Sequence, residues 1–167
     1  CWKNFFMKHL LFKYLFFFFW KRTARPIPGN PSRILVIRQD NRIGNLILIT
    51  PFLSLVKQRW PGARLDVVVG GFFGEVISNN PDIDSMLVYD QLAFIRMPWK
   101  FLLFIRRLRK NKYDIVFDMK PVFSFNNMMM TVLSGAAFRA GFKNPLSSGF
   151  FHCEVDLPRP DLYDAEY

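Results

Sequence analysis

The sequence predicts an α/β fold in which a parallel β-sheet carries helices on both faces. After residue 32, short β-branched runs alternate with stretches of helical periodicity. The runs are apolar along nearly their whole length, which is typical of strands that are covered on both sides. With 51% hydrophobic residues, the 167-residue chain can bury one core of usual size. The order of strands and helices predicts a Rossmann-like sheet of about five strands.

The predicted elements follow one another closely along the chain. Strands are expected at Arg33–Arg38, Arg64–Val69, Ser85–Tyr89, Asp114–Met119 and Phe138–Phe142. Helices are expected at Asn45–Trp60, Phe72–Ser78, Met97–Lys110 and Ser124–Ser134. Pro51 either opens a helix after a Thr50 cap or kinks a longer helix. Right-handed crossovers would bring three loops to the carboxyl edge, where such sheets bind ligands: Gln39–Gly44, Gly70–Gly71 and Lys120–Ser124.

An aromatic and basic segment precedes this sheet. Residues 1–25 contain six bases, no acid and ten aromatic side chains. The longest apolar run, Tyr14–Trp20, has seven residues, whereas a membrane span needs about 20. We therefore predict that residues 1–25 lie on a membrane surface, with packing against protein as the alternative. Residues 26–32 are interpreted as a linker, and the natural chain could start at Cys1 or at Met7.

The charge of the chain predicts an anionic partner. Lys and Arg total 23 against 13 Asp and Glu, which gives a net charge of +10. Nucleic acid is not expected, because the aromatic residues form an apolar block instead of alternating with bases. Residues 91–113 hold seven further bases and no acid, either as a solvated helix face or as a second contact with an anionic membrane or acceptor. In that helix, the residues expected to face inward are Phe101, Leu102, Ile105 and Leu108. The residues expected to face outward are Arg106, Arg107, Arg109 and Lys110.

Several other kinds of site are not supported by the sequence. Cys1 and Cys153 form no C-x-x-C pair, so a structural metal site is not expected. Glycines follow the second predicted strand, but they lack the G-x-G-x-x-G spacing of a dinucleotide-binding turn, so no cofactor is expected. His9 and His152 have no recognisable nucleophile partner, so a catalytic triad is not supported.

The exit from the first strand is the most informative stretch, because a glycine there lets a ligand approach the backbone next to a helix start. Short motifs follow in order: RILVIRQDNRIGNLILITP at 33–51, WPGARLDVVV at 60–69, NPDID at 80–84, YDIVFD at 113–118, SGA at 134–136 and RAGF at 139–142. In this order they resemble glycosyltransferase family 9, the lipopolysaccharide heptosyltransferases. The resemblance covers about residues 33–142.

The resemblance implies a GT-B glycosyltransferase, in which two Rossmann-like domains face a cleft. Residues 33–145 would form its acceptor-binding half, and residues 146–167 would lead to a missing second domain that holds the nucleotide-sugar donor. The implied function is transfer of a sugar, a heptose in this family, to lipopolysaccharide core or a related glycolipid. The implied location is the cytoplasmic face of the bacterial inner membrane. The 167-residue fragment alone is expected to be inactive.

The resemblance also implies an inverting reaction, in which a carboxylate deprotonates the acceptor hydroxyl. The family places an Asp after Ile-Gly, but this chain has Asn45 there, and an amide cannot accept a proton at neutral pH. Asp40 could replace it or could merely brace its loop, and Asp118 could act or could pair with Lys120. If neither acts, the chain would be a non-catalytic membrane- or glycolipid-binding module.

Four basic residues are expected near the same sheet edge: Arg38, Arg42, Lys120 and Arg139. Because guanidinium groups match phosphate oxygens, these residues and Gly44 are candidates for binding the phosphates of a lipid-linked glycan acceptor. The alternative for each base is a side chain that only faces solvent.

Overall fold

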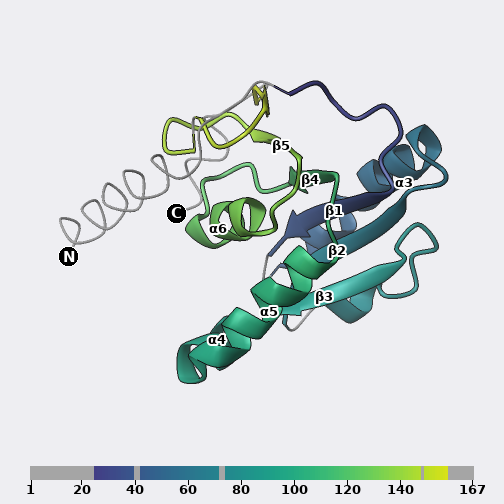
Figure 1. Cartoon of the computed structure of the whole chain (residues 1–167). Helices are drawn as coiled ribbons and strands as arrows, with labels where there is room; N and C mark the ends of the chain where they lie inside the picture. Colours follow the sequence, from purple (N-terminus) through teal and green to yellow (C-terminus); the bar gives the residue numbers. More distant parts are fainter. Residues whose placement is uncertain (1–24, 40–41, 72–73, 148, 158–167) are drawn as a thin grey trace.

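The computed structural model describes residues 25–39, 42–71, 74–147 and 149–157, and its centre is one parallel sheet (Figure 1). The sheet order is β3-β2-β1-β4-β5-β6. The strands are β1 (Arg33–Arg38), β2 (Arg64–Gly70), β3 (Ser85–Tyr89), β4 (Ile115–Asp118), β5 (Phe138–Phe142) and β6 (Cys153–Val155). All neighbouring strands pair in parallel, so the predicted α/β Rossmann-like fold is confirmed.

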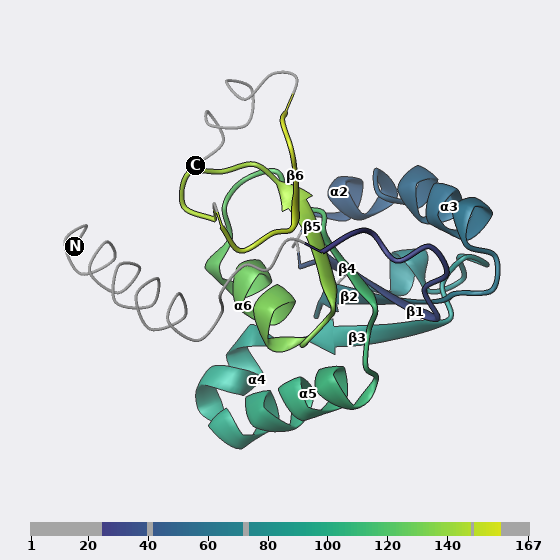
Figure 2. The same cartoon turned by 45° about the horizontal axis from the view of Figure 1, so that its top comes forward.

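Helices cover both faces of the sheet, as Figure 2 shows. On one face, α2 (Ile43–Ile47), α3 (Thr50–Arg59) and the 3₁₀ turn η1 (Gly74–Ile77) pack on the side chains of alternate strand residues. On the other face, α5 (Pro98–Lys110) and α6 (Phe125–Leu133) pack on the residues between them. This two-sided burial explains why the strands are apolar without alternation.

The predicted helix Asn45–Trp60 is divided into α2 and α3. Pro51 lies in the first turn of α3, where its missing N–H costs no hydrogen bond. Ile49 is the N-cap residue, while the Thr50 hydroxyl donates to the Ile47 carbonyl at 2.8 Å. Pro51 therefore opens a new helix after a short turn. The predicted helix Phe72–Ser78 is only the 3₁₀ turn η1, and residues 72–73 lie outside the described part of the chain.

The predicted basic helix Met97–Lys110 is present as α5, but an unpredicted helix precedes it and one of its residues faces outward against expectation. A separate helix, α4 (Gln91–Arg96), precedes α5, and the Asp90 carboxylate caps it by accepting from Ala93 N–H at 3.0 Å. The expected inward position of Leu102 is wrong, because Leu102 is 68% exposed and Phe104 is buried instead. At about 100° per residue, Phe104 shares a helix face with Leu108, whereas Leu102 does not.

Two predicted segments fall largely outside the described residues. The predicted membrane-surface segment 1–25 is described only at Arg25, and the tail 146–167 is described to residue 157 apart from residue 148. That tail contains β6, which pairs with β5, so the sheet extends beyond residue 145. Within the part of the chain that the structure describes, no helix is both long enough and apolar enough to cross a membrane.

Candidate functional site

The chain changes direction in the sheet between β1 and β4. From β1 the chain moves outward to β2 and β3, and from β4 it moves the opposite way to β5 and β6. Crevices at such switch points, outside the carboxyl ends of the strands, are where open α/β sheets bind ligands. Arg38 ends β1 and Asp118 ends β4, so these two charged residues meet at this point.

The Arg38 side chain ties the two central strands together. It is only 7% exposed, and its Nη1 donates a hydrogen bond to the carbonyl of Met119, the residue after β4. The strands are already in register, because Ile37 is paired with Asp118. Arg38 therefore links the end of β1 to the chain after β4, and little of its side chain is exposed at this edge.

Asp118 is a buried carboxylate at the same edge. Its Oδ1 accepts from Asn127 Nδ2 at 2.9 Å and from the Lys120 backbone N–H at 3.1 Å. Burial raises the pKa of Asp118 to about 6, although these hydrogen bonds and the charge of Arg38 act in the opposite direction. A carboxyl with such a pKa changes protonation close to neutral pH.

A small cavity lies beside Asp118. Its volume of about 10 Å³ has room for about one water molecule. Its polar lining comes from Asp118, Lys120, Ser124, Asn144 and Ser147. Among the described residues, no group of three or more His, Cys, Asp or Glu side chains could hold a metal ion.

The loop after β1 carries the other predicted residues of this edge. Arg42 and Gly44 are exposed, and Asn45 is half-buried in the first turn of α2. A Cβ atom on Gly44 would meet no atom within 4 Å, so the backbone there is open to approach. Asp40 lies outside the described residues. The five residues of α2 are too few for its N-terminus to act as an anion site by itself.

The structure does not bring Arg139 to this edge. Arg139 is the second residue of β5 and pairs with Val116, two positions before Asp118. It is 2% exposed, and its backbone exchanges contacts with His152, whose Nδ1 accepts from Arg139 N–H at 3.0 Å. Burial and the nearby charge of Arg25 lower the pKa of Arg139 to about 10, so its guanidinium remains charged at neutral pH.

Asn127 is a site residue that the sequence motifs do not indicate. Its side chain is fully buried in the first turn of α6, next to the Ser124 cap. The sequence signals it only weakly, as one of two adjacent amides in the mostly apolar stretch 125–133. Buried amides are expected to have hydrogen-bond partners, but the sequence does not tell which.

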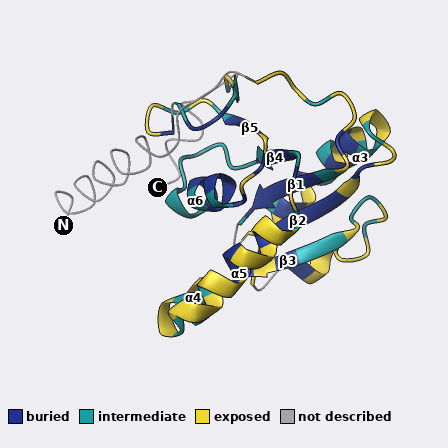
Figure 3. Cartoon of the chain, viewed as in Figure 1, coloured by how far each residue is buried: buried dark blue, intermediate teal, exposed yellow. Residues whose placement is uncertain are grey.

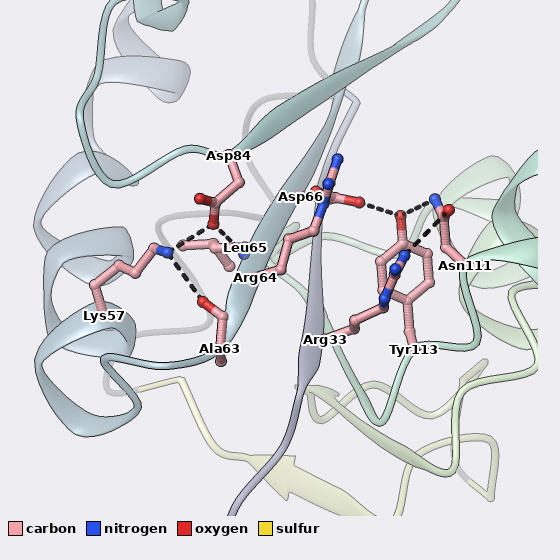
Figure 4. A network of polar contacts seen from close by, with 9 residues as sticks. All are labelled: Arg33, Lys57, Ala63, Arg64, Leu65, Asp66, Asp84, Asn111 and Tyr113. Carbon is pink, nitrogen blue, oxygen red and sulfur yellow. Dashed lines mark hydrogen bonds and ion pairs between the residues drawn. The ribbon is translucent and has the colours of Figure 1, made fainter.

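Several motif residues lie at the opposite, amino edge of the sheet (Figure 4). The Tyr113 hydroxyl donates to the buried Asp66 carboxylate at 2.8 Å and accepts from Asn111 Nδ2 at 2.8 Å. Asp84 accepts from Lys57 Nζ at 2.6 Å and from the Leu65 backbone N–H at 2.7 Å. These two sets of hydrogen bonds hold the starts of strands and the ends of helices in place, far from the carboxyl edge.

The SGA and RAGF motifs also have structural explanations. Gly135 adopts a left-handed φ of 73° directly after α6, where a side chain would be strained. A Cβ on Gly141 would come within 2.6 Å of the Phe151 ring, so only glycine fits there without a shift. Most motif residues therefore stabilise the fold, whereas the β1–α2 loop and Asp118 lie at the carboxyl edge of the sheet.

No family model matches the sequence. Among curated proteins, the provisionally named lipopolysaccharide heptosyltransferase 4 of Escherichia coli K12 is 25% identical over 118 residues, which are 70% of this chain and 31% of that protein. Lipopolysaccharide heptosyltransferase 3 of the same strain is 27% identical over 84 residues, or 46% of this chain and 23% of that protein. The chain thus spans about a third or less of the length of these relatives.

Solved structures of glycosyltransferases are also similar to this chain. A family 9 glycosyl transferase from Veillonella parvula superposes with a TM-score of 0.68 and 23% identity, over 84% of this chain and 41% of that one. The E. coli ADP-heptose LPS heptosyltransferase II superposes with a TM-score of 0.61 and 20% identity, over 76% of this chain and 35% of that one. E. coli heptosyltransferase WaaC with ADP also gives 0.61, at 22% identity over 75% of this chain and 41% of that one.

These solved structures are too distant in sequence to show more than the fold. The curated relatives add matches to two lipopolysaccharide heptosyltransferases. The resemblance of this chain to glycosyltransferase family 9, which its motifs indicate, is therefore confirmed, together with the Rossmann-like α/β fold.

Proposed function

We infer that this domain serves a glycosyltransferase of the lipopolysaccharide heptosyltransferase type by binding a phosphorylated, lipid-linked glycan acceptor at its carboxyl edge. The observation that carries this proposal is the meeting of Arg38 and Asp118 at the switch point, with Arg42, Gly44 and Lys120 in the adjoining loops. The transferred sugar would be a heptose from a nucleotide-heptose donor held by a second domain. The protein would work at the cytoplasmic face of the inner membrane.

Arg42 and Lys120 are the proposed phosphate contacts. Arg42 is exposed beside the open backbone of Gly44, and the Lys120 backbone is anchored to Asp118. Arg38 would stabilise the position of these residues through its hydrogen bond to Met119, whereas Arg139, buried in β5 away from this edge, is not part of the proposed site. Hydrogen bonds to charged groups contribute about 1.5–3 kcal/mol each when buried, and less at an exposed site.

The proton acceptor would be a carboxylate and not Asn45. Asp40 stays the first candidate from the sequence, and Asp118 is the carboxylate of this edge with a pKa raised to about 6 by its burial. Asn45 in place of the family aspartate favours the alternative of a non-catalytic membrane- or glycolipid-binding module. A glycosyltransferase and a non-catalytic binding module differ in one measurable step, the formation of a glycosidic bond.

Acceptor binding is tested on this chain by calorimetry with a delipidated, phosphorylated core oligosaccharide and with its dephosphorylated form. We expect binding of the phosphorylated form only, and weakening by about three- to ten-fold in Lys120→Ala and Arg42→Ala. The matched control is Arg59→Ala, an exposed base at the end of α3. Equal binding of both glycans, or equal effects of all three variants, would reject the site.

Transfer is tested on the natural polypeptide that contains this chain, supplied with ADP-heptose and the same acceptor. Mass spectrometry should detect the addition of one heptose. Loss of the product in Asp40→Asn with retention in Asp118→Asn would assign the base to Asp40, and the reverse would assign it to Asp118. No product with any nucleotide-heptose or nucleotide-hexose would leave only the binding module.

A further inference from the structure

Helix α5 has two apolar faces in its first half, and the sheet covers only one. The inner face places Phe104, Ile105 and Leu108 on the sheet, each at most 9% exposed. Exposed large apolar side chains gathered on a second side of the helix indicate a further partner, because soluble proteins seldom expose extended apolar patches.

The exposed apolar side chains of α4 and of the first half of α5 are together referred to as the outer face. Its large side chains are between 58% and 69% exposed, and much of this surface is coloured as exposed in Figure 3. Within α4, Leu92 and Ile95 are three residues apart, and within α5, Leu102 and Leu103 are three and four residues after Trp99, so each set shares one side of its own helix. The members are Leu92, Ile95, Trp99, Leu102 and Leu103.

Between the α4 cap Asp90 and Asp114, all charged residues near the outer face are basic. No acidic residue occurs between Asp90 and Asp114. The exposed bases that flank the face or continue it along α5 are Arg96, Lys100, Arg106, Arg107, Arg109 and Lys110. Exposed Leu, Ile and Trp within a border of Lys and Arg form the composition of a helix that lies in the interface of an anionic bilayer.

The outer face lies at the same end of the sheet as the candidate acceptor site. Helix α4 begins two residues after Tyr89, the last residue of β3, so α4 and the start of α5 extend past the carboxyl edge (Figure 1). An apolar hollow of about 220 Å³ between α4, α5 and α6 is lined by Tyr89, Phe94 and Phe101 on one side and Asn126 and Met129 on the other. Asn126 is adjacent to Asn127, which holds Asp118.

We propose that the outer face of α4–α5 docks on an anionic lipid bilayer and so holds the carboxyl edge of the sheet at the membrane surface. A second copy of this chain would bring two basic borders together, and their repulsion opposes such a dimer. A bilayer of anionic lipid matches both features of the surface: its apolar layer accommodates the leucines and Trp99, and its phosphates bind the bases. This docking surface is formed by residues of α4 and α5, and it does not depend on the sugar-transfer chemistry.

The first test compares two equally exposed leucines. Leu103 on the outer face and Leu55 on α3 are both 61% exposed, so replacing either by Glu leaves the core intact. Co-flotation is measured with vesicles of phosphatidylethanolamine and phosphatidylglycerol. We expect Leu103→Glu, alone or with Leu102→Glu, to lower the partition coefficient by about ten-fold or more, and Leu55→Glu to leave it unchanged. Equal partitioning of the Leu103 and Leu55 variants would overturn the proposal.

The second test addresses the charges. Lys100→Glu combined with Arg107→Glu should weaken binding to these vesicles by at least about five-fold per base at low salt, and less at high salt. The matched control is Arg59→Glu on α3, which is exposed on the other face of the sheet. Equal losses in all variants would indicate only the general effect of net charge and would reject a defined docking surface.

The third test identifies what covers the face. With Cys1 and Cys153 replaced by Ser, an environment-sensitive dye on Leu103→Cys should brighten when anionic vesicles are added, and the dye on Leu55→Cys should not. A dye that is already shielded without vesicles would mean that a second copy or residues 1–24 occupy the face, which would overturn the proposal. Binding of the soluble glycan should be the same in Leu103→Glu, so failure here is distinct from failure of the acceptor site.

Discussion

Asn127 donates a hydrogen bond from Nδ2 to Oδ1 of Asp118 at 2.9 Å, which joins the first turn of α6 to the carboxyl end of β4. Both residues are buried, with Asn127 at 0% and Asp118 at 7% exposure. The same Oδ1 also accepts the Lys120 N–H, so one carboxylate fixes the start of the loop and the start of the helix. The geometry of this edge therefore depends on a single buried acid.

Asp118 should make the stability of the domain fall as pH rises. Its pKa in the folded state is about 6, against 3.8 ordinarily, because burial disfavours the charged form. Between these values the folded state binds more protons than the unfolded state, so raising pH through this window costs on the order of 2–3 kcal/mol. Asp118→Asn should remove this loss. Urea unfolding of both proteins from pH 4 to pH 7.5 measures it, and parallel pH profiles would contradict it.

Removing Asn127 should destabilise the carboxyl edge. Asn127→Ala takes away a hydrogen bond that favours the charged form of Asp118, so the pKa of Asp118 should rise further. We expect a loss of about 1–3 kcal/mol in the free energy of unfolding at pH 7. The control Asn126→Ala changes a half-buried neighbour and should cost less. Carbon-13 NMR of the Asp118 carboxyl follows the pKa directly, and an unchanged value would exclude the coupling.

Replacing Gly141 by Ala should disturb the packing between β5 and the segment before β6. The new methyl group would lie within 3.0 Å of the Phe151 ring, so the ring or the strand must move. Overpacking of this kind costs about 1–3 kcal/mol. Gly62→Ala, where a Cβ meets no atom within 4 Å, is the control and should change little. Adding Phe151→Leu should recover part of the loss if the ring is the cause.

Tyr113→Phe should lower stability without changing glycan binding. The variant removes the hydroxyl that donates to the buried Asp66 carboxylate at the amino edge, and leaves that acceptor short of one partner. The expected loss is about 1–3 kcal/mol in chemical unfolding. Because the network lies at the end of the strands away from the candidate site, the affinity for the phosphorylated oligosaccharide should be unchanged. Weaker binding together with unchanged stability would refute this assignment.

Asp84 should have the opposite pH dependence to Asp118. Burial raises its pKa, but the hydrogen bonds from Lys57 and the Leu65 N–H outweigh burial and hold the pKa below its usual value. A lowered pKa gives stability that is present above the unfolded-state pKa and is lost as pH falls through the folded-state value. Asp84→Asn should therefore destabilise at pH 7 and progressively less in acid. A variant that loses the same stability at pH 3 and pH 7 would contradict this.

The sequence alone was sufficient for the strands and their parallel arrangement. Each of the five predicted strands is present, because an apolar run between turn residues is a local signal that survives in the fold. The described residues of the loop after β1 also lie at the carboxyl edge, as predicted, since all strands of a parallel sheet end on the same side. The strand β6, with three residues and a central Glu154, has no such signal.

The tertiary structure alone decided which side chains meet. Residues 101–105 are all apolar, so periodicity could not separate the outward Leu102 and Leu103 from the inward Phe104 and Ile105. Likewise, an amide in α6 became the partner of Asp118, and Arg139 was held inside β5, because strand order and helix docking set distances between residues far apart in the chain. Local sequence fixes secondary structure through short-range sterics and burial, whereas a site depends on long-range packing that no single segment encodes.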